Sequence, residues 1–449
     1  MNSNQRDGFS TKFGVVAAAT GSAIGLGNIW RFPYIAGENG GGAFLLVYLG
    51  FVLLIGIPVM LSEFSIGRKA QSNAAGSFKI LAPGKKWYLV GMMGIVAAFV
   101  ILAFYSTIAG WTLEYVYQSV INIFAGKTGV PPSEIFQEFH TSTTRPLIWQ
   151  SIFMVLTAAI ILGGVKKGIE KYSKILMPLL LIILIALCAR SVSLEGAKDG
   201  LKFLFQPDFS KINADVILNA LGQAAFSLSV GMGALITYGS YIRKNNNLTK
   251  TAFQVSIADV SIAILAGIAI FPAVFAFGVA PESGAGLVFI VLPSVFQQMT
   301  GGQIFELMFF LLLAIAALTS AISILEVVVA YFVDEFKIKR KKATILASLS
   351  VSIIGVFATL SFSSLESFQF FHKSIFEILE FFAANLLLPL GALLIVMFLG
   401  WFYPLKLTKN EITNNGILKV NIFPVFVIII KFIAPIAITI VFLNGIGIF

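Results

Sequence analysis

The chain has 449 residues, of which 58% are hydrophobic and 12% are charged, and its formal net charge is +10. Soluble globular chains carry roughly 25% charged residues, so this composition excludes a soluble protein built around one core. It indicates an all-helical protein that crosses a lipid bilayer many times.

About eleven apolar stretches have the length of ~20 residues that a membrane-crossing helix needs. They lie at about 11–36, 42–67, 87–124, 147–164, 172–190, 214–241, 250–280, 303–333, 343–361, 375–402 and 422–446. The stretch at 87–124 is too long for a straight crossing, so we expect it to tilt or to extend beyond the bilayer.

Lys and Arg residues lie mainly before the first stretch and in the even-numbered loops, with few in the odd-numbered loops. Cytoplasmic loops carry an excess of these residues, so we expect a cytoplasmic N-terminus, an extracytoplasmic C-terminus and a place in the inner (plasma) membrane. The same bias accounts for the positive net charge, so no nucleic-acid partner is expected. No metal-ligand spacing, nucleophile motif or phosphate loop occurs, which argues against an enzyme.

The first apolar stretch is interrupted where a membrane helix should be most regular. Gly21, Gly25 and Gly27 lie among small residues, and Arg31 follows. Irregular backbone at bilayer depth is tolerated only when it is buried in protein or lines a polar cavity, and an ionisable group there indicates a functional site. We therefore expect a broken helix that forms an ion or substrate site.

The sixth stretch is interrupted in the same way by Ser227, Ser229, Gly231 and Gly233. Five stretches separate the two interruptions, so the two halves would run in opposite directions. Paired interruptions of this kind are typical of inverted-repeat transporters. We predict one membrane domain over 1–449, with repeats at about 11–190 and 214–402, helices one and six unwound at mid-membrane, and an extra helix at about 422–446.

Residues 25–33 read GLGNIWRFP, and residues 38–44 read ENGGGAF. These segments resemble the neurotransmitter:sodium symporter family, in particular its small bacterial amino-acid carriers related to the leucine transporter. The resemblance covers nearly the whole chain. It implies a 5+5 inverted repeat and alternating access driven by sodium, in a carrier that needs the bilayer but no protein partner.

The resemblance also implies two sodium sites, and sodium is a hard cation that prefers oxygen ligands. The first site would use Ala23, Asn28, Ser227, a group on the seventh stretch and the substrate carboxylate. The second would use Gly21, Ile24, Ala316, Thr319 and Ser320. Taken without the resemblance, Thr319 and Ser320 would simply donate hydrogen bonds to the preceding turn of their helix.

Asp259 departs from the family pattern on the seventh stretch. The position that often holds an ion-binding Asn aligns with Ala258, and Asp259 is the next residue. An unpaired acid at this depth costs on the order of 3 kcal/mol. We interpret Asp259 as an ion ligand, or as a fixed negative charge that makes chloride unnecessary; the alternative is a solvated acid near the cytoplasmic end.

The resemblance predicts a substrate site without ionisable side chains, which disfavours charged amino acids. Gly25 replaces the Asp of monoamine carriers and leaves room for an amino-acid carboxylate, and flexible Met232 suits varied side chains. We predict a carrier of hydrophobic L-amino acids, aromatic ones included. The predicted lining is Ser22, Ala23, Gly25, Leu26, Gly27, Ile101, Tyr105, Phe226, Ser227, Ser229, Met232, Ser320 and Ile324.

The resemblance further implies gates on both sides of this site. Outside it, Tyr105 and Phe226 would form a lid, and Arg31 would meet Glu377 and Glu380. On the inner side, Arg6 would pair with Asp334 beside Phe9 and Tyr241. Glu63 would brace the unwound segments, and the spacing of Gly168 and Pro178 is the one with which bacterial relatives unwind the fifth helix.

Two other functions are compatible with the same sequence. One is a sodium- or proton-coupled carrier of another small solute, such as an amine or an osmolyte. The other is a sensor on the same fold that does not transport.

Overall fold

The computed structural model describes residues 7–125, 130–278 and 286–448. Apart from an isolated β-bridge between Phe370 and Lys373, these residues form helices and connecting loops. The expectation of an all-helical fold is confirmed.

The elements of the first part of the chain run from the first apolar stretch to the fifth. They are α1 (Lys12–Ala23), the π-helical η1 (Gly27–Arg31), α2 (Phe32–Glu38), α3 (Gly42–Phe51), the π-helical η2 (Val52–Gly56), α4 (Ile57–Ala70), α5 (Ala74–Leu81), α6 (Tyr88–Ala125), α7 (Pro132–Thr141), α8 (Arg145–Leu162), the π-helical η3 (Val165–Glu170) and α9 (Lys171–Val192).

The middle of the chain contains the sixth to ninth stretches. Its elements are α10 (Ala197–Phe205), the short 3-10 helix η4 (Phe209–Lys211), α11 (Ala214–Ser227), α12 (Ala234–Tyr241), α13 (Leu248–Ala276), the π-helical η5 (Leu287–Val291), α14 (Leu292–Gln298), α15 (Gly302–Phe336) and α16 (Arg340–Leu360).

The last part holds the tenth and eleventh stretches. Its elements are α17 (Ile375–Phe381), η6 (Phe382–Leu387), α18 (Leu388–Met397), η7 (Phe398–Phe402), α19 (Leu405–Ile412), α20 (Phe423–Ile428), η8 (Ile429–Ile433) and α21 (Ala434–Gly445), with η6, η7 and η8 in π-helical form.

Nine continuous helical runs in the described residues are long and apolar enough to cross a membrane. A tenth crossing is formed by α1 with η1 and α2, which are bent by 54° at residues 24–26. The remaining predicted stretch is divided into α11 and α12, of 14 and 8 residues. Together these elements account for the eleven stretches expected from the sequence.

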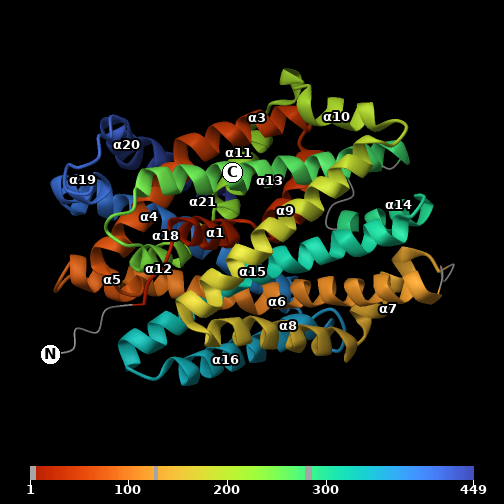
Figure 1. Ribbon diagram of the computed structural model, residues 1–449, viewed down its shortest axis with the longest axis horizontal. Coiled ribbons are helices and arrows are strands. Elements are labelled where there is room, and N and C mark those ends of the chain that lie inside the picture. Colours follow the sequence, from red (N-terminus) through yellow and green to blue (C-terminus); the bar gives the residue numbers. More distant parts are fainter. Residues whose placement is uncertain (1–6, 126–129, 279–285, 449) are drawn as a thin grey trace.

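Figure 1 shows the long helices running lengthwise through the molecule, with α5 and α19 at one end and α7, α10 and α14 at the other. Helix α1 lies in the interior, where it packs against α9, α13 and α15. Nine of its twelve residues are buried, which is unusual for a helix that could contact lipid. The first broken helix is therefore surrounded by protein, as irregular backbone at bilayer depth requires.

Side chains at the helix starts fix where several of these elements begin. Thr11 accepts a hydrogen bond from the Gly14 amide at the start of α1, and Asn247 accepts one from the Lys250 amide at the start of α13. Ser374 and Glu377 form a capping box at the start of α17. Such caps satisfy amides that have no partner in the first helical turn.

At the end that carries α5 and α19, Arg68 joins three segments far apart in sequence. Its side chain is 1% exposed, and its Nε donates to the Glu411 carboxylate at 2.5 Å. Its Nη1 donates to the Asn246 carbonyl at 2.7 Å. Because a buried guanidinium needs partners for its donors, this arrangement ties α4 to α19 and to the loop after α12.

Candidate substrate and ion site

The break after α1 follows from its sequence. Helix α1 ends at Ala23, and Ile24 has an extended conformation with φ −77° and ψ 107°. The last carbonyls of a helix have no amide partner within it. At this break the Ser22 carbonyl accepts hydrogen bonds from Ser229 Oγ at 2.8 Å and Ser320 Oγ at 3.3 Å. The first break is therefore bonded both to the second break and to α15.

The second break occupies residues 228–233, between α11 and α12. Ser229, Gly231 and Gly233 have φ values of 54°, 88° and 75°, in the left-handed region that favours glycine. The Gly231 amide donates to Glu63 Oε1 at 2.7 Å, and Glu63 is fully buried. Glu63 thus contacts the unwound segment of the sixth helix as its predicted bracing role requires.

Asp259 lies where the two breaks meet. Its Oδ1 accepts a hydrogen bond from Asn28 Nδ2 at 2.7 Å, and its Oδ2 accepts one from Ser227 Oγ at 2.5 Å. The Tyr48 hydroxyl lies 3.2 Å from Oδ2 and 3.1 Å from Ser227 Oγ. Asp259 is fully buried, whereas Ala258 is only half-buried. The seventh helix therefore directs Asp259 toward the candidate first sodium site.

The carbonyl and hydroxyl groups predicted for the second sodium site lie between α1 and α15. A Cβ atom on Gly21 would lie 3.3 Å from Thr319 Cβ and 3.3 Å from Met177 Sδ, so α1 approaches both α15 and α9 closely here. Ala316 is fully buried. Thr319 Oγ1 donates to the Ile315 and Ala316 carbonyls at 3.1 Å, as a helical Thr does, and such a hydroxyl keeps lone pairs for a cation.

Two predicted pocket residues show why small side chains are needed at this depth. A Cβ atom on Gly25 would lie 3.0 Å from Ser320 Cβ and 3.1 Å from the Tyr105 hydroxyl. A Cβ on Gly27 would lie 3.1 Å from the Phe226 ring. A carboxylate side chain at position 25, as in monoamine carriers, therefore does not fit in this arrangement.

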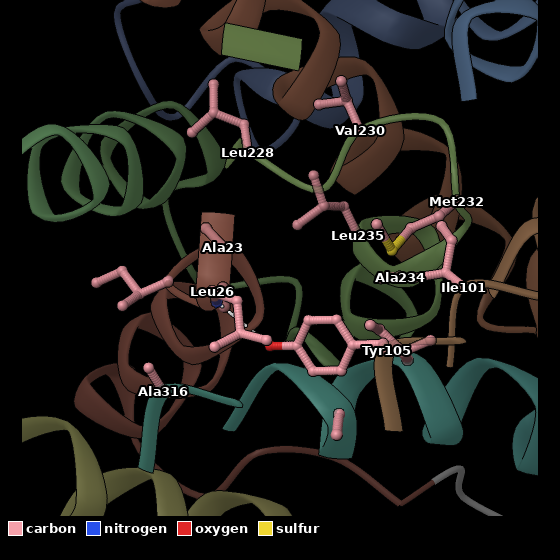
Figure 2. Packing of buried hydrophobic residues seen from close by; sticks show 14 of the residues in the cluster. Ala23, Leu26, Ile101, Tyr105, Leu228, Val230, Met232, Ala234, Leu235 and Ala316 are labelled. Atoms are coloured by element: carbon pink, nitrogen blue, oxygen red, sulfur yellow. Dashed lines mark hydrogen bonds between the residues drawn. The ribbon is translucent and has the colours of Figure 1, made fainter. Parts of the chain in front are cut away.

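Apolar groups from four segments surround the breaks. Figure 2 shows Tyr105 reaching from α6 to Leu26, whose amide donates to the Tyr105 hydroxyl at 3.3 Å. The same view draws Met232 on the second break and Ile101 on α6, and both are buried. Several predicted lining residues are buried, namely Ser22, Ala23, Leu26, Ile101, Tyr105, Ser227, Ser229, Met232, Ser320 and Ile324. Among them, Ser22 is bonded to Ser229 and Ser320, and Leu26 to Tyr105, while the lining as a whole stays a prediction.

A vestibule with a volume of about 510 Å³ lies beyond Tyr105 and Phe226. Its walls include Arg31, Glu377 and Glu380 and an aromatic group consisting of Trp30, Tyr34, Phe104, Trp111, Phe136, Phe289, Phe362 and Phe376. The Arg31 guanidinium lies over the Phe226 ring, 4.5 Å from its centre. A cation in this position is attracted by the ring face.

The structure differs from the expected outer gate. Among the described ion pairs there is none between Arg31 and Glu377 or Glu380. Glu377 Oε2 instead accepts hydrogen bonds from the Ser374 amide at 2.7 Å and the Ser374 hydroxyl at 2.9 Å. The capping box at the start of α17 therefore holds Glu377, a consequence that a match to the family pattern alone does not predict.

At the inner side, Phe9 is 2% exposed and packs edge-on against Tyr238 and Tyr241, with ring centres 5.7 and 6.1 Å apart. Asp334 Oδ2 accepts a hydrogen bond from the Asn73 amide at 2.8 Å. Arg6 lies outside the described residues, so its pairing with Asp334 stays a prediction. The Phe9–Tyr241 contact is formed as expected.

The sequence analysis missed an ion pair in the same region. The Tyr241 hydroxyl donates to Glu326 Oε1 at 2.6 Å, and Arg340 Nη2 contacts Glu326 Oε2 at 2.5 Å. Glu326 is an acid inside an apolar stretch, which is itself a signal of function. Tyr48 was also missed, because a single Tyr in an apolar stretch carries no signal of its own.

A buried acid between two broken helices, beneath a vestibule and above an aromatic plug, defines a secondary transporter of the inverted-repeat type. Residues 6–128 and 136–449 match the model of the sodium:neurotransmitter symporter family. The chain belongs to this family and is a sodium-dependent membrane transporter.

Relatives with similar sequences support this assignment. The uncharacterized sodium-dependent transporter YhdH of Bacillus subtilis is 41% identical over 444 residues, which cover 98% of each chain. The sodium-dependent dopamine transporter of Bos taurus is 27% identical over 451 residues, covering 89% of this chain and 63% of that protein. The crystal structure of MhsT in complex with L-phenylalanine matches with a TM-score of 0.91 and 48% identity, covering 98% of this chain and 100% of that one.

Proposed function

We propose that this protein imports hydrophobic L-amino acids, aromatic ones included, together with two sodium ions and without a need for chloride. The observation that carries this proposal is Asp259, a fully buried carboxylate bonded to Asn28 and Ser227 where the two breaks meet. A buried anion needs a compensating cation, and the surrounding groups are oxygen donors of the kind that sodium prefers.

The substrate would bind next to this charge. Its carboxylate would meet the amides freed by the breaks, where Gly25 leaves space, and its side chain would lie among Ile101, Met232 and Ile324. Among the buried residues that the structure describes, Arg68 is the only Lys or Arg, and it is bonded to Glu411 on α19. An acidic substrate side chain would therefore remain unpaired. The match to a structure with bound L-phenylalanine is consistent with an aromatic substrate.

Sodium-dependent uptake into proteoliposomes tests this proposal. We expect an inward sodium gradient to drive uptake of labelled leucine, with phenylalanine, tyrosine and tryptophan competing, in sulfate buffer as well as in chloride. Asn28→Ala should abolish the sodium dependence, and Lys198→Ala, in the outer helix α10, is the matched control. Glycine or glutamate competing better than leucine, or uptake without sodium, would contradict it.

The orientation and location expected from the loop charges belong to the same proposal. The N-terminus would lie in the cytoplasm and the C-terminus outside, with the carrier in the plasma membrane and no protein partner required. Under this orientation the vestibule opens to the outside and the Phe9–Tyr241 contact closes the cytoplasmic side.

A further inference from the structure

Helix α18 packs against the second break through backbone atoms. A Cβ atom on Gly231 would lie 2.4 Å from the Leu388 carbonyl oxygen, and one on Gly391 would lie 2.5 Å from the Gly231 carbonyl oxygen. Atoms do not approach this closely without displacement, so the contact requires glycine on both sides. The tenth crossing thus supports the unwound part of the sixth without a side chain between them.

The Gly231 residue is held from two directions. Its amide donates to Glu63 on α4 at 2.7 Å, and its carbonyl lies against Gly391 on α18. Its φ of 88° already excludes most other residues. A displacement at the Gly391 contact therefore moves the backbone of the break, because Gly231 has no side chain to absorb it.

The break presents different residues to its two sides. Ser229 donates its hydroxyl to the Ser22 carbonyl on α1 at 2.8 Å, whereas Gly231, two residues later, lies against α18. The segment also lies against α6, where a Cβ atom on Gly94 would be 3.2 Å from the Met232 carbonyl carbon. A shift of Gly231 therefore moves the segment relative to α1 and α6. Met232, which follows Gly231 in the chain, would move with it.

We propose that Gly391 is a positioning residue that sets the width of the substrate pocket. The α18 backbone limits where the Gly231 backbone can lie. Gly231 in turn sets the position of Met232, the pocket residue that would contact the substrate side chain. This inference rests on the proposed function, because it takes the space between the breaks as the amino-acid site. A narrower pocket penalises the largest side chains most.

The test is the variant Gly391→Ala, studied as the full-length protein by equilibrium competition against labelled leucine in sodium. We expect the affinity for tryptophan to fall about tenfold or more and the affinity for leucine to change less than about threefold, since one carbon in an apolar pocket is worth about 10–200-fold. The measured quantity is the ratio of the two affinities, which a general loss of stability does not change.

Two glycine-to-alanine controls isolate the contact. Gly222→Ala adds a methyl where nothing lies within 4 Å. Gly200→Ala is crowded, since its Cβ would lie 2.5 Å from the Phe271 backbone, but it lies in the outer helix α10. We expect neither to change the ratio. An unchanged ratio in Gly391→Ala, or an equal change in Gly200→Ala, would overturn the inference.

If Gly391→Ala does not fold, Pro389→Ala provides the same test without adding an atom at the contact. Pro389 is the second residue of α18, next to Leu388, whose carbonyl contacts Gly231. Proline has no amide hydrogen, so an alanine there can donate to a carbonyl of the preceding turn and shift Leu388 against Gly231. The tryptophan-to-leucine ratio should then change at least threefold, and an unchanged ratio contradicts the proposal. Absence of sodium-dependent binding in the wild type would instead contradict the proposed function.

Discussion

Asp259 uses its two carboxylate oxygens for different partners. Oδ1 accepts a hydrogen bond from the Asn28 side-chain amide, just after the first break, and Oδ2 accepts one from the Ser227 hydroxyl, just before the second. Removing an ionised carboxylate from water costs several kcal/mol even after the protein relaxes, and hydrogen bonds return only part of this cost. A bound cation next to the carboxylate would supply the rest, which supports the proposal that Asp259 both links the two breaks and takes part in sodium binding.

Replacing Asp259 with Asn tests this dual role. Asp259→Asn keeps the size of the side chain and removes its charge, so we expect the apparent sodium affinity in chloride-free buffer to fall at least tenfold, about 1.4 kcal/mol. Adding chloride should restore part of the loss if the charge rather than the ligand atom matters. The measurement is the sodium dependence of leucine binding in gluconate and in chloride.

Asp215→Asn is the matched control, because Asp215 is exposed in the first turn of α11. We expect its sodium dependence to equal that of the wild type in both buffers. A sodium affinity of Asp259→Asn that is unchanged in gluconate would show that neither role is correct.

Sequence patterns predicted the residues that break helices and the acid between them, because glycine, serine and charge at bilayer depth are local signals. They did not predict partners that meet only in the folded chain. Tyr48 and Asp259 are separated by 211 positions, and Arg68 and Glu411 by 343. The family pattern pairs Glu377 with Arg31, but Ser374 is the donor that Glu377 accepts from. The S-x-x-E spacing of Ser374 and Glu377 is a capping-box signature that the sequence analysis overlooked.

At the scale of helices, Glu170 connects the start of α1 to the start of α9. It lies at the end of the π-helical η3, and its carboxylate accepts hydrogen bonds from the Ser10 amide at 2.7 Å and the Thr11 hydroxyl at 2.9 Å. Lys174 lies 2.5 Å from the same carboxylate. Carboxylates stabilise helix N-termini by accepting from free amides, so α9 holds the inner half of the first crossing.

Neutralising this contact should loosen the inner half of α1. We expect Glu170→Gln to weaken sodium-dependent leucine binding about threefold to tenfold. The charge-assisted hydrogen bonds of Glu170, worth about 1.5–3 kcal/mol, become weaker neutral ones. Conformations open to the cytoplasm should then become more populated. Equilibrium binding and thermal unfolding in the absence of sodium measure the two effects separately.

Glu366→Gln replaces an exposed carboxylate in the loop before α17 and serves as the control for the loss of one charge. If Glu170→Gln lowers the unfolding temperature without any effect on sodium-dependent binding, the contact only stabilises the fold. Equal binding constants for both variants would exclude a role of Glu170 in holding α1 during transport.

For the molecule as a whole, both ends carry a cavity, and the one lined by Tyr241, Arg243 and Lys244 holds about 610 Å³. The two ends differ in the packing of the aromatic side chains. Phe9 is buried against Tyr238 and Tyr241, and Tyr241 is bonded to Glu326, whereas the vestibule beyond Tyr105 holds about 510 Å³. Alternating access requires that this order reverse. Arg31 and Glu380 line the vestibule and take part in none of the ion pairs found among the described residues, and we propose that they close it.

The energy available to the cycle depends on the number of coupled sodium ions, for which we propose two. One charge that crosses 100 mV is worth about 2.3 kcal/mol, and a tenfold sodium gradient adds about 1.4 kcal/mol per ion. Two ions provide about 7 kcal/mol, which limits the accumulation of a zwitterionic amino acid to roughly 10⁵-fold. A carrier coupled to one sodium ion would reach only about the square root of that limit. The number of sodium ions per amino acid can therefore be determined from the accumulation ratio at equilibrium.

We therefore predict the point of zero net flux in proteoliposomes clamped at zero membrane potential. With two coupled ions, the ratio of internal to external leucine at zero flux should equal the square of the ratio of external to internal sodium. A tenfold sodium gradient should then balance about a hundredfold leucine gradient, each tenfold in leucine being worth about 1.4 kcal/mol.

If the logarithm of the leucine ratio rises with the logarithm of the sodium ratio with a slope of one, only one of the two candidate sodium sites is coupled. In that case Asp259→Asn and Thr319→Ala would distinguish the sites, because the variant that removes the coupled site abolishes gradient-driven uptake and the other leaves the slope at one.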